Sequence, residues 1–378
     1  MNLRFLHYTG RLIGVFLLSA LYGCNESEDP QNADSPVRIS YRINTGWNNI
    51  QSNTRGLAFD NTESFTTEGR TFRVTAWMEK TGYAWEPLVS NSNPNALNDV
   101  DVSYQGATIG WSADNPYFWP DMEYQAYFYA RYPSNVPFNG TDKTIVYNST
   151  TPIDGNTDMM YATYRGGYLF NEGGGVPVSL DFHHALSCVQ FMAVRSGELT
   201  VTVNSLEICN VRSQGTFTYP AALTGDDYGD FGTGSWSGVT GYANYSLNNN
   251  SLVLTTTPQL LTSETYGSSL MFVPQTTTAW NNTANTIAAN DGSTGPKGTY
   301  LKIGCSVVFG GHTYNDAGYV YCPISLNLTA GTKTIYTIGF GVGYDSNGIK
   351  LLQSIVLSTQ VVDWTVGGSE SPTNVYIN

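Results

Sequence analysis

The chain has little charge and few of the residues that build metal or catalytic sites. Lys, Arg, Asp and Glu make up only 12% of its 378 residues, with 17 basic against 30 acidic side chains. It contains four histidines and five cysteines, and no Cys-x-x-Cys pair. Without residues 1–23, which hold two arginines and no acids, the net charge is −15, and such a surface repels phosphate backbones. We therefore expect no nucleic-acid partner, no metal and no other cofactor.

The N-terminal apolar stretch is too short to span a bilayer. Residues 12–23 follow two arginines and match the apolar region of a secretory signal. The stretch ends in "LYGC", which resembles a bacterial lipobox with Cys24 as the acylated residue. We expect residues 1–23 to be a lipoprotein signal peptide and residues 24–36 an acidic tether. The alternative is an ordinary secretory signal followed by an incidental cysteine.

Long helical patterns are also lacking. No apolar pattern with helical spacing extends over more than about three turns. From residue 37 onward, short runs of alternating apolar and polar residues are broken by Gly, Asn, Asp and Pro, which is typical of β-sandwiches. The first run places four apolar residues on one face of a strand: Val37, Ile39, Tyr41 and Ile43. Residues 224–250 and 276–297 are rich in Ser, Gly and Asn and are expected to be surface loops. The expected fold is all-β.

Two cysteines in the second half could form a disulfide. Cys305 and Cys322 lie in strand-like runs on either side of a glycine-containing turn. If Phe309 pairs with Gly318, the two cysteines lie opposite each other, where a cross-strand disulfide is possible. Two small buried side chains explain the same pattern. The sequence leaves both interpretations open.

The segment "FHHALSC" (residues 182–188) holds two of the four histidines. Adjacent residues of a strand point to opposite faces, so His183 and His184 do not readily bind one ion. His184 shares its face with four apolar residues, Val178, Leu180, Phe182 and Leu186. We therefore interpret His184 as a hydrogen-bonded core histidine and not as a metal ligand or catalytic base.

Two further stretches are candidates for binding. "GDDYGDFG" clusters Asp226, Asp227 and Asp230, which indicates either a solvated loop or a weak cation site. "WSADNPYFWPD" (residues 111–121) is rich in aromatic residues. Its large rings could form a platform on which a sugar stacks, or they could fill the core at the entry to a strand. The residues of this candidate glycan platform are Trp111, Tyr117, Phe118 and Trp119.

The order of several segments resembles the fimbrillin family, the subunits of type V pili of outer-membrane bacteria. After the lipobox these segments are "NTRGLAF" (53–59), "PYFWPDMEYQAYFYARYP" (116–133), "TDMMYATY" (157–164), "VSLDFHHALSCVQF" (178–191), "LMFVPQTT" (270–277), "LTAGTKTIYTIGF" (328–340) and "VVDWTVGG" (361–368). The similarity spans nearly the whole chain. It implies two tandem transthyretin-like β-sandwich domains, residues 37–195 and 196–378.

The resemblance also implies assembly by strand exchange. In the family, an arginine-directed protease removes the lipidated N-terminal strand, and a C-terminal segment of another subunit fills the groove that opens. Here the expected cleavage site is Arg55-Gly56, in a polar stretch that a protease could reach. The displaced strand is the one with Val37, Ile39, Tyr41 and Ile43. Residues 351–362 or 374–378 could be the donor.

The sequence thus favours a structural or adhesive pilus subunit without enzyme activity. It would be lipid-anchored in the outer membrane at the cell surface before processing and part of the fimbrium afterwards. Its partners would be other pilus subunits, in a homo- or heteropolymer, and a host or bacterial surface receptor. Stalk, tip and anchor roles all stay open. The alternative is a surface glycan-binding lipoprotein that uses the aromatic platform.

Overall fold

Strands make up most of the described part of the chain in the computed structural model. The structure describes residues 37–44, 66, 69–80, 94, 96–120, 123–148, 158–167, 177–225, 227–261, 270–281, 298–344, 346, 350–352 and 355–363. The chain divides after Val37 into two units, and nearly all of these residues belong to the second, Arg38–Asn378. Every element with described bounds is a β-strand, which confirms the all-β prediction. Within the described ranges, no helix has the length and apolarity needed to cross a membrane.

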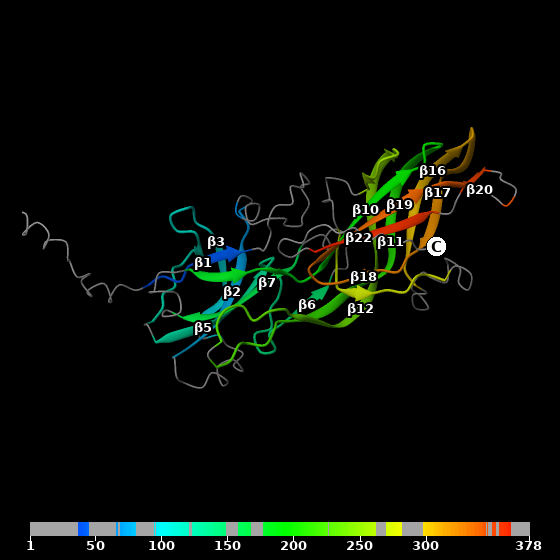
Figure 1. Ribbon diagram of the computed structural model, residues 1–378. Coiled ribbons are helices and arrows are strands. Elements are labelled where there is room, and N and C mark those ends of the chain that lie inside the picture. Colours follow the sequence, from blue (N-terminus) through cyan, green and yellow to red (C-terminus); the bar gives the residue numbers. More distant parts are fainter. Residues whose placement is uncertain are drawn as a thin grey trace, which may run out of the picture. The chain divides into compact units, whose positions relative to one another are not determined.

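The first sheet contains eight strands (Figure 1). They are β1 (Tyr41–Asn44), β2 (Phe72–Lys80), β3 (Leu97–Tyr104), β4 (Trp111–Ala113), β5 (Tyr124–Tyr132), β7 (Met160–Gly167), β8 (Val178–Asp181) and β9 (His183–His184). Their order across the sheet is β8-β1-β4-β3-β2-β5-β7-β9. The N-terminal strand β1 is therefore an internal strand, with a neighbour on each side.

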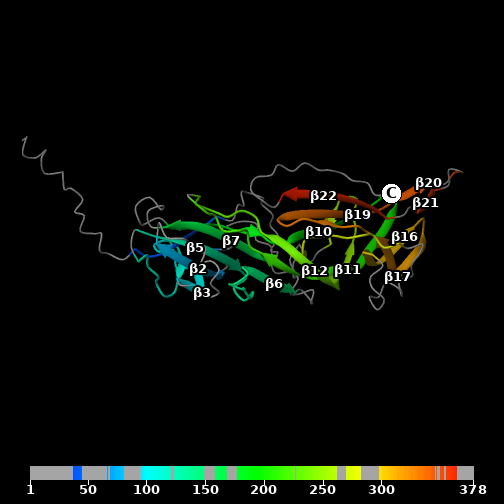
Figure 2. The same cartoon turned by 90° about the horizontal axis from the view of Figure 1, so that it is seen from below.

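Two five-stranded sheets follow (Figure 2). The second sheet consists of β10 (Ser187–Arg195), β13 (Gln259–Leu260), β14 (Leu270–Phe272), β19 (Thr332–Phe340) and β22 (Val356–Asp363). The third consists of β6 (Thr144–Asn148), β11 (Leu199–Thr218), β12 (Ser235–Val253), β16 (Tyr300–Phe309) and β17 (His312–Pro323). Two strand pairs complete the set: β15 (Gln275–Thr276) with β18 (Asn327–Leu328), and β20 (Val342–Tyr344) with β21 (Lys350–Leu352).

The second and third sheets bury one continuous hydrophobic core. It combines Phe191 of β10 and Ile338 of β19 with Val203 of β11 and Ile303 of β16, all of them buried. The Phe191 ring stacks on Tyr336 with 5.4 Å between the ring centroids. Apolar faces of two sheets that pack on each other define a β-sandwich. The β-sandwich prediction agrees with this arrangement.

The strand β10 bears on the predicted domain boundary. By sequence it ends the predicted N-terminal domain, residues 37–195, yet it runs parallel to β19 from Cys188, opposite Lys333, to Arg195, opposite Phe340. Its sheet otherwise contains strands from the second half of the chain. The division into residues 37–195 and 196–378, and the transthyretin-like type of each half, stay predictions.

The expected surface loop at residues 224–250 is wrong from Ser235 onward. Residues Ser235–Val253 form the long strand β12, which pairs antiparallel with β11 over most of its length. The composition of β12 is poor in strand-forming residues, but the ladder with β11 supplies its backbone hydrogen bonds. The positive φ angle of Gly238, +59°, accommodates the register shift of this ladder between Gln214 and Thr216.

Of the two interpretations of Cys305 and Cys322, the structure excludes the disulfide. The hairpin turns tightly at Gly310 and Gly311, whose φ angles are +56° and +83°, so that Phe309 pairs with His312. Two register shifts then place Gly318 opposite Cys305, while Cys322 lies opposite Leu301. Both cysteines are free thiols.

Candidate strand-exchange site

The N-terminal segment from Arg38 to Asn44 is bonded into the first sheet on both sides. The strand β1 runs parallel to β8, with Tyr41 opposite Val178, and pairs antiparallel with Trp111 of β4. Just upstream, the N–H of Ile39 donates to the carbonyl of Tyr117 at 2.7 Å. On the other side, the N–H of Val178 donates to the carbonyl of Ser40 at 2.8 Å. The segment thus completes the ladder between two other strands.

One face of this segment is buried, as the alternation predicted. Ile39, Tyr41 and Ile43 are 4%, 4% and 7% exposed, and Val37 is half-buried. Arg42, on the opposite face, is exposed. Burial of an aliphatic or aromatic side chain stabilises by about 1.5–3 kcal/mol. The segment is therefore held by its side chains as well as by its backbone.

Tyr41 has the most extensive aromatic contacts of the segment. Its ring meets Phe72 and Phe128 edge-on, with centroids 6.2 and 6.1 Å apart. Burial, with a smaller contribution from Tyr117, raises the pKa of the Tyr41 hydroxyl. The phenol therefore stays neutral at physiological pH and adds no charge to the slot that it fills.

Arg38 fixes the position of the segment along β4. Its Nη2 donates to Oγ of Ser112 at 2.8 Å and to the carbonyl of Ala113 at 3.1 Å. Charge-assisted hydrogen bonds of this kind are stronger than neutral ones. They set the register in which the apolar side chains enter the slot.

The candidate glycan platform does not form as expected. Trp111 and Trp119 are buried and Tyr117 is half-buried, so of the four rings only Phe118 is largely exposed, at 43%. The Trp111 ring packs on Phe72 at 5.5 Å, and the Trp119 ring packs on Phe128 at 6.0 Å. Because Phe72 and Phe128 also contact Tyr41, the two tryptophans extend the aromatic cluster around the β1 segment.

Several expected residues lie outside the described ranges. These are the lipidation residue Cys24, the cleavage site Arg55 and Gly56, and the candidate donor 374–378. Most of the other candidate donor, 351–362, is described. It contributes to β21 and β22, and β22 pairs antiparallel with β19 at the edge of the second sheet.

The two histidines contact different carboxylates, as their opposite faces predicted. Nδ1 of His184 lies 2.8 Å from Oδ2 of Asp158 in the interior, which confirms a core histidine. Nε2 of His183 lies 2.7 Å from Oδ2 of Asp230. Burial raises the pKa of Asp230, but hydrogen bonds from His183 and Thr163 outweigh this effect and hold the pKa below its ordinary value.

The acidic loop is packed on β7 through Arg165. Nη1 of Arg165 donates to the carbonyls of Gly225 and Asp227, both at 2.8 Å, and the backbone of Arg165 pairs with Gly229. Asp230 is engaged by His183, and Asp226 lies outside the described residues. Across the described residues, no three His, Cys, Asp or Glu side chains converge as a metal site would require. The described part of this loop is therefore bonded to β7 rather than freely solvated.

Solved structures similar to this chain come from Bacteroides species. A fimbrial protein of Bacteroides vulgatus aligns over 87% of this chain and 100% of its own, with 15% identity and a TM-score of 0.51. A candidate cell adhesion protein of Bacteroides ovatus aligns over 88% of this chain and 99% of its own, with 16% identity and a TM-score of 0.47. No curated protein matches the sequence. The fimbrillin-like family profile matches residues 54–364, which is most of the chain, and the protein therefore belongs to the fimbrillin-like family.

Proposed function

We propose that the protein is a fimbrial subunit, or a tip or anchor adhesin, of the outer-membrane surface that mediates cell adhesion. It is lipidated at Cys24 and carried to the surface, where a protease cuts at Arg55-Gly56. The released segment includes β1 and the lipid. A strand from another subunit then occupies the vacated slot, in a homo- or heteropolymer, and the role requires no catalysis.

The observation that supports this proposal most directly is the position of β1 inside the first sheet. The segment is an internal strand bonded to β8 and β4, and it buries Ile39, Tyr41 and Ile43. It precedes the proposed cleavage site in the chain, so a single cut separates it from the rest of the fold. Removal exposes an apolar slot flanked by unpaired backbone groups on two strands, which is the surface that strand addition requires.

Replacement of Arg55 tests the processing step. We expect the Arg55→Ala and Arg55→Lys chains to stay at precursor size and to form no polymer ladder on gels of unheated cell extracts. The matched control is Arg70→Ala, an arginine of the same region beyond the proposed site, which should be processed and polymerise normally. A normal ladder from Arg55→Ala would overturn the assignment of the cleavage site.

The position in the fimbrium is decided by imaging. Immunogold labelling along the filament identifies a stalk subunit, labelling at its free end a tip, and labelling at the cell surface an anchor.

The lipid anchor is tested in the same cells. Cys24→Ser should release the precursor from the membrane fraction, because one substitution removes every acyl chain. Retention of the serine variant in the outer membrane would contradict the lipid anchor.

A further inference from the structure

A pocket lies where the long strand β11 changes partners. On one side β11 pairs with β12 over most of its length. On its other side it pairs with β16 as far as Cys209 and with β6 from Gln214 onward. In the described part of the chain, neither of these two strands reaches residues 210–213. The ladder is interrupted there, and its backbone groups need other partners.

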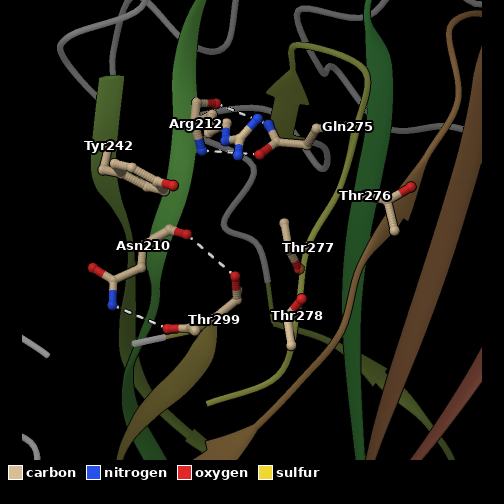
Figure 3. A pocket seen from close by; sticks show the side chains of 9 residues that line it. Asn210, Arg212, Tyr242, Gln275, Thr276, Thr277, Thr278 and Thr299 are labelled. Carbon is tan, nitrogen blue, oxygen red and sulfur yellow. Dashed lines mark hydrogen bonds between the residues drawn. The ribbon is translucent and has the colours of Figure 1, made fainter. Parts of the chain in front are cut away.

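The side chain of Gln275 takes the place of a strand beside Arg212. Its Oε1 accepts the N–H of Arg212 at 2.9 Å, and its Nε2 donates to the carbonyl of Arg212 at 2.8 Å (Figure 3). Next along β11, Asn210 has a φ angle of +64° and donates through Nδ2 to the carbonyl of Gly298 at 3.0 Å. Oγ1 of Thr299 donates to the carbonyl of Asn210 at 3.2 Å. The pocket is thus held open by fixed backbone contacts.

The pocket has a volume of about 350 Å³, which lies in the usual range of small-molecule sites. It is lined by Asn210, Arg212, Tyr242, Gln275, Thr276, Thr277, Thr278, Gly298 and Thr299. Tyr242 and Asn210 face Thr277 and Thr278 across it (Figure 3). The lining consists of hydroxyl and amide groups with one aromatic ring and one cation, and it contains no carboxylate.

Arg212 brings the only charge of this lining. It lies opposite Tyr242 in the ladder, and its guanidinium is 5.8 Å from the centroid of the Tyr242 ring. Among the described residues the guanidinium donates one hydrogen bond, from Nη1 to the carbonyl of Val239 at 3.2 Å, and forms no ion pair. Since a guanidinium carries five N–H donors, most of its donors are available. A carboxylate is the partner that its forked geometry fits best.

We propose that this pocket binds a saccharide that carries a carboxylate, such as a uronic or a sialic acid. Arg212 receives the carboxylate, and the ring of Tyr242, 49% exposed, stacks on the C–H face of the sugar. The hydroxyl groups of the sugar are matched by the threonines of the opposite wall. An apolar peptide side chain would gain little here, because the lining is polar. The site is separate from the β1 slot and does not depend on assembly.

The test is a titration of the purified, unpolymerised full chain with glucuronic acid and with N-acetylneuraminic acid, followed by saturation-transfer NMR and calorimetry. Glucose and galactose serve as uncharged ligands. We expect the acids to bind at least tenfold more tightly than the neutral sugars, with an affinity that falls as salt is added. The acid that binds more tightly identifies the class of saccharide that supplies the carboxylate.

Variants then assign the binding to the pocket. Arg212→Ala and Tyr242→Ala should each weaken acid binding at least tenfold, and Arg212→Lys should weaken it less than Arg212→Ala. Gln275 bonds to the backbone of Arg212, so these changes leave the ladder intact, and circular dichroism checks the fold. The controls are Arg73→Ala and Tyr314→Ala, an arginine and an exposed tyrosine outside the pocket. Equal binding of neutral sugars, unchanged binding by Arg212→Ala, or no binding of either acid would overturn the proposal.

Discussion

Nδ1 of His184 lies 2.8 Å from Oδ2 of Asp158, and the two side chains are 2% and 0% exposed. The pair joins β9 to the residues just before β7, next to the backbone pairing of His184 with Met160. The short contact between the imidazole nitrogen and the carboxylate oxygen offsets part of the cost of burying both groups in such a dry environment. Removal of one partner leaves the other buried without its match, which is the costly situation.

We therefore expect Asp158→Ala to lower the free energy of unfolding by about 3–5 kcal/mol. Urea denaturation followed by tryptophan fluorescence measures this change. The matched control is Asp227→Ala, because Asp227 is exposed and its hydrogen bonds to Arg165 and Thr224 are made by its backbone. A change below about 1 kcal/mol for Asp158→Ala would contradict a structural role for the pair.

Asp230, which His183 contacts, contributes to the stability of the fold in a pH-dependent way. Hydrogen bonds from His183 and Thr163 hold the pKa of Asp230 below its ordinary value of 3.8, against the effect of burial. A lowered folded-state pKa stabilises above the unfolded-state pKa, and this stabilisation is lost as the pH falls through the folded-state value. We expect Asp230→Asn to be less stable than the parent at pH 7, and we expect this difference to shrink as the pH falls below 3.8 and through the lowered folded-state pKa. Unfolding curves over a series of pH values check this, and a difference that stays constant with pH would contradict it.

Arg165 holds the loop 225–231 against β7. It is buried, donates to the carbonyls of Gly225 and Asp227, and lies over the rings of Tyr127 and Tyr228 at 5.1 and 4.8 Å. Hydrogen bonds from a charged donor contribute about 1.5–3 kcal/mol each, so we expect Arg165→Ala to destabilise by roughly 3 kcal/mol. Limited proteolysis should then cut within the loop.

The control for the Arg165 experiment is Arg73→Ala. Arg73 forms partly exposed ion pairs with Asp99 and Asp101, and pairs of that kind contribute about 0–1 kcal/mol. It should leave both the stability and the cleavage pattern close to those of the parent. Cleavage of the loop at the same rate in Arg165→Ala and in the parent would show that Arg165 does not hold it.

The cysteines of the β16–β17 hairpin should stay reduced. Cys305 and Cys322 are free, and burial raises the pKa of both thiols, partly offset at Cys305 by a hydrogen bond from Asn315. Because the thiolate is the reactive form, we expect slow alkylation of the folded protein at pH 7.5. In denaturant without reductant, peptide mass mapping should find both cysteines labelled. Two unlabelled residues joined by a bridge would refute the register.

This hairpin shows where prediction from the sequence ends. The alternation of apolar residues identified the strands and their buried faces, because side-chain direction depends only on local parity. The partner of each residue depends on turn geometry and on bulges. The tight turn at Gly310 and Gly311 and two register shifts moved Cys305 away from Cys322.

The same limit on prediction applies to the strand-exchange site and to the pocket beside β11. The buried face of Val37–Ile43 followed from its pattern, but its parallel pairing with β8 joins residues more than a hundred positions apart, which no local pattern encodes. The saccharide pocket was missed because β12 was interpreted as a loop. The pocket forms at a gap in the β11 ladder, which the sequence does not reveal. Recognition of residues 235–253 as a strand would have placed Tyr242 beside Arg212.

The strongest test of the assembly model is to make the β1 segment exchangeable in the folded protein. A specific protease site inserted at residue 55 allows the chain to be nicked after folding, so that β1 is held only by its contacts. We expect a labelled peptide of residues 37–44, added in excess, to replace the resident segment over hours at 37 °C, as mass spectrometry of the complex would show. The exchange is slow because release of the segment breaks its backbone hydrogen bonds to β8 and β4 and at the same time exposes three buried apolar side chains to water.

Point variants of the same nicked protein show which side chains retain the β1 segment. Tyr41→Ala removes the ring that meets Phe72 and Phe128, a loss of about 3–5 kcal/mol for a buried aromatic residue, and should accelerate release at least a hundredfold. Arg42→Ala, on the exposed face of the same strand, should release at the parental rate. Equal rates for the two variants would mean that backbone pairing alone retains β1. An incoming donor strand would then need no apolar side chains to match the slot, and the alternation of Ile39, Tyr41 and Ile43 would have no part in assembly.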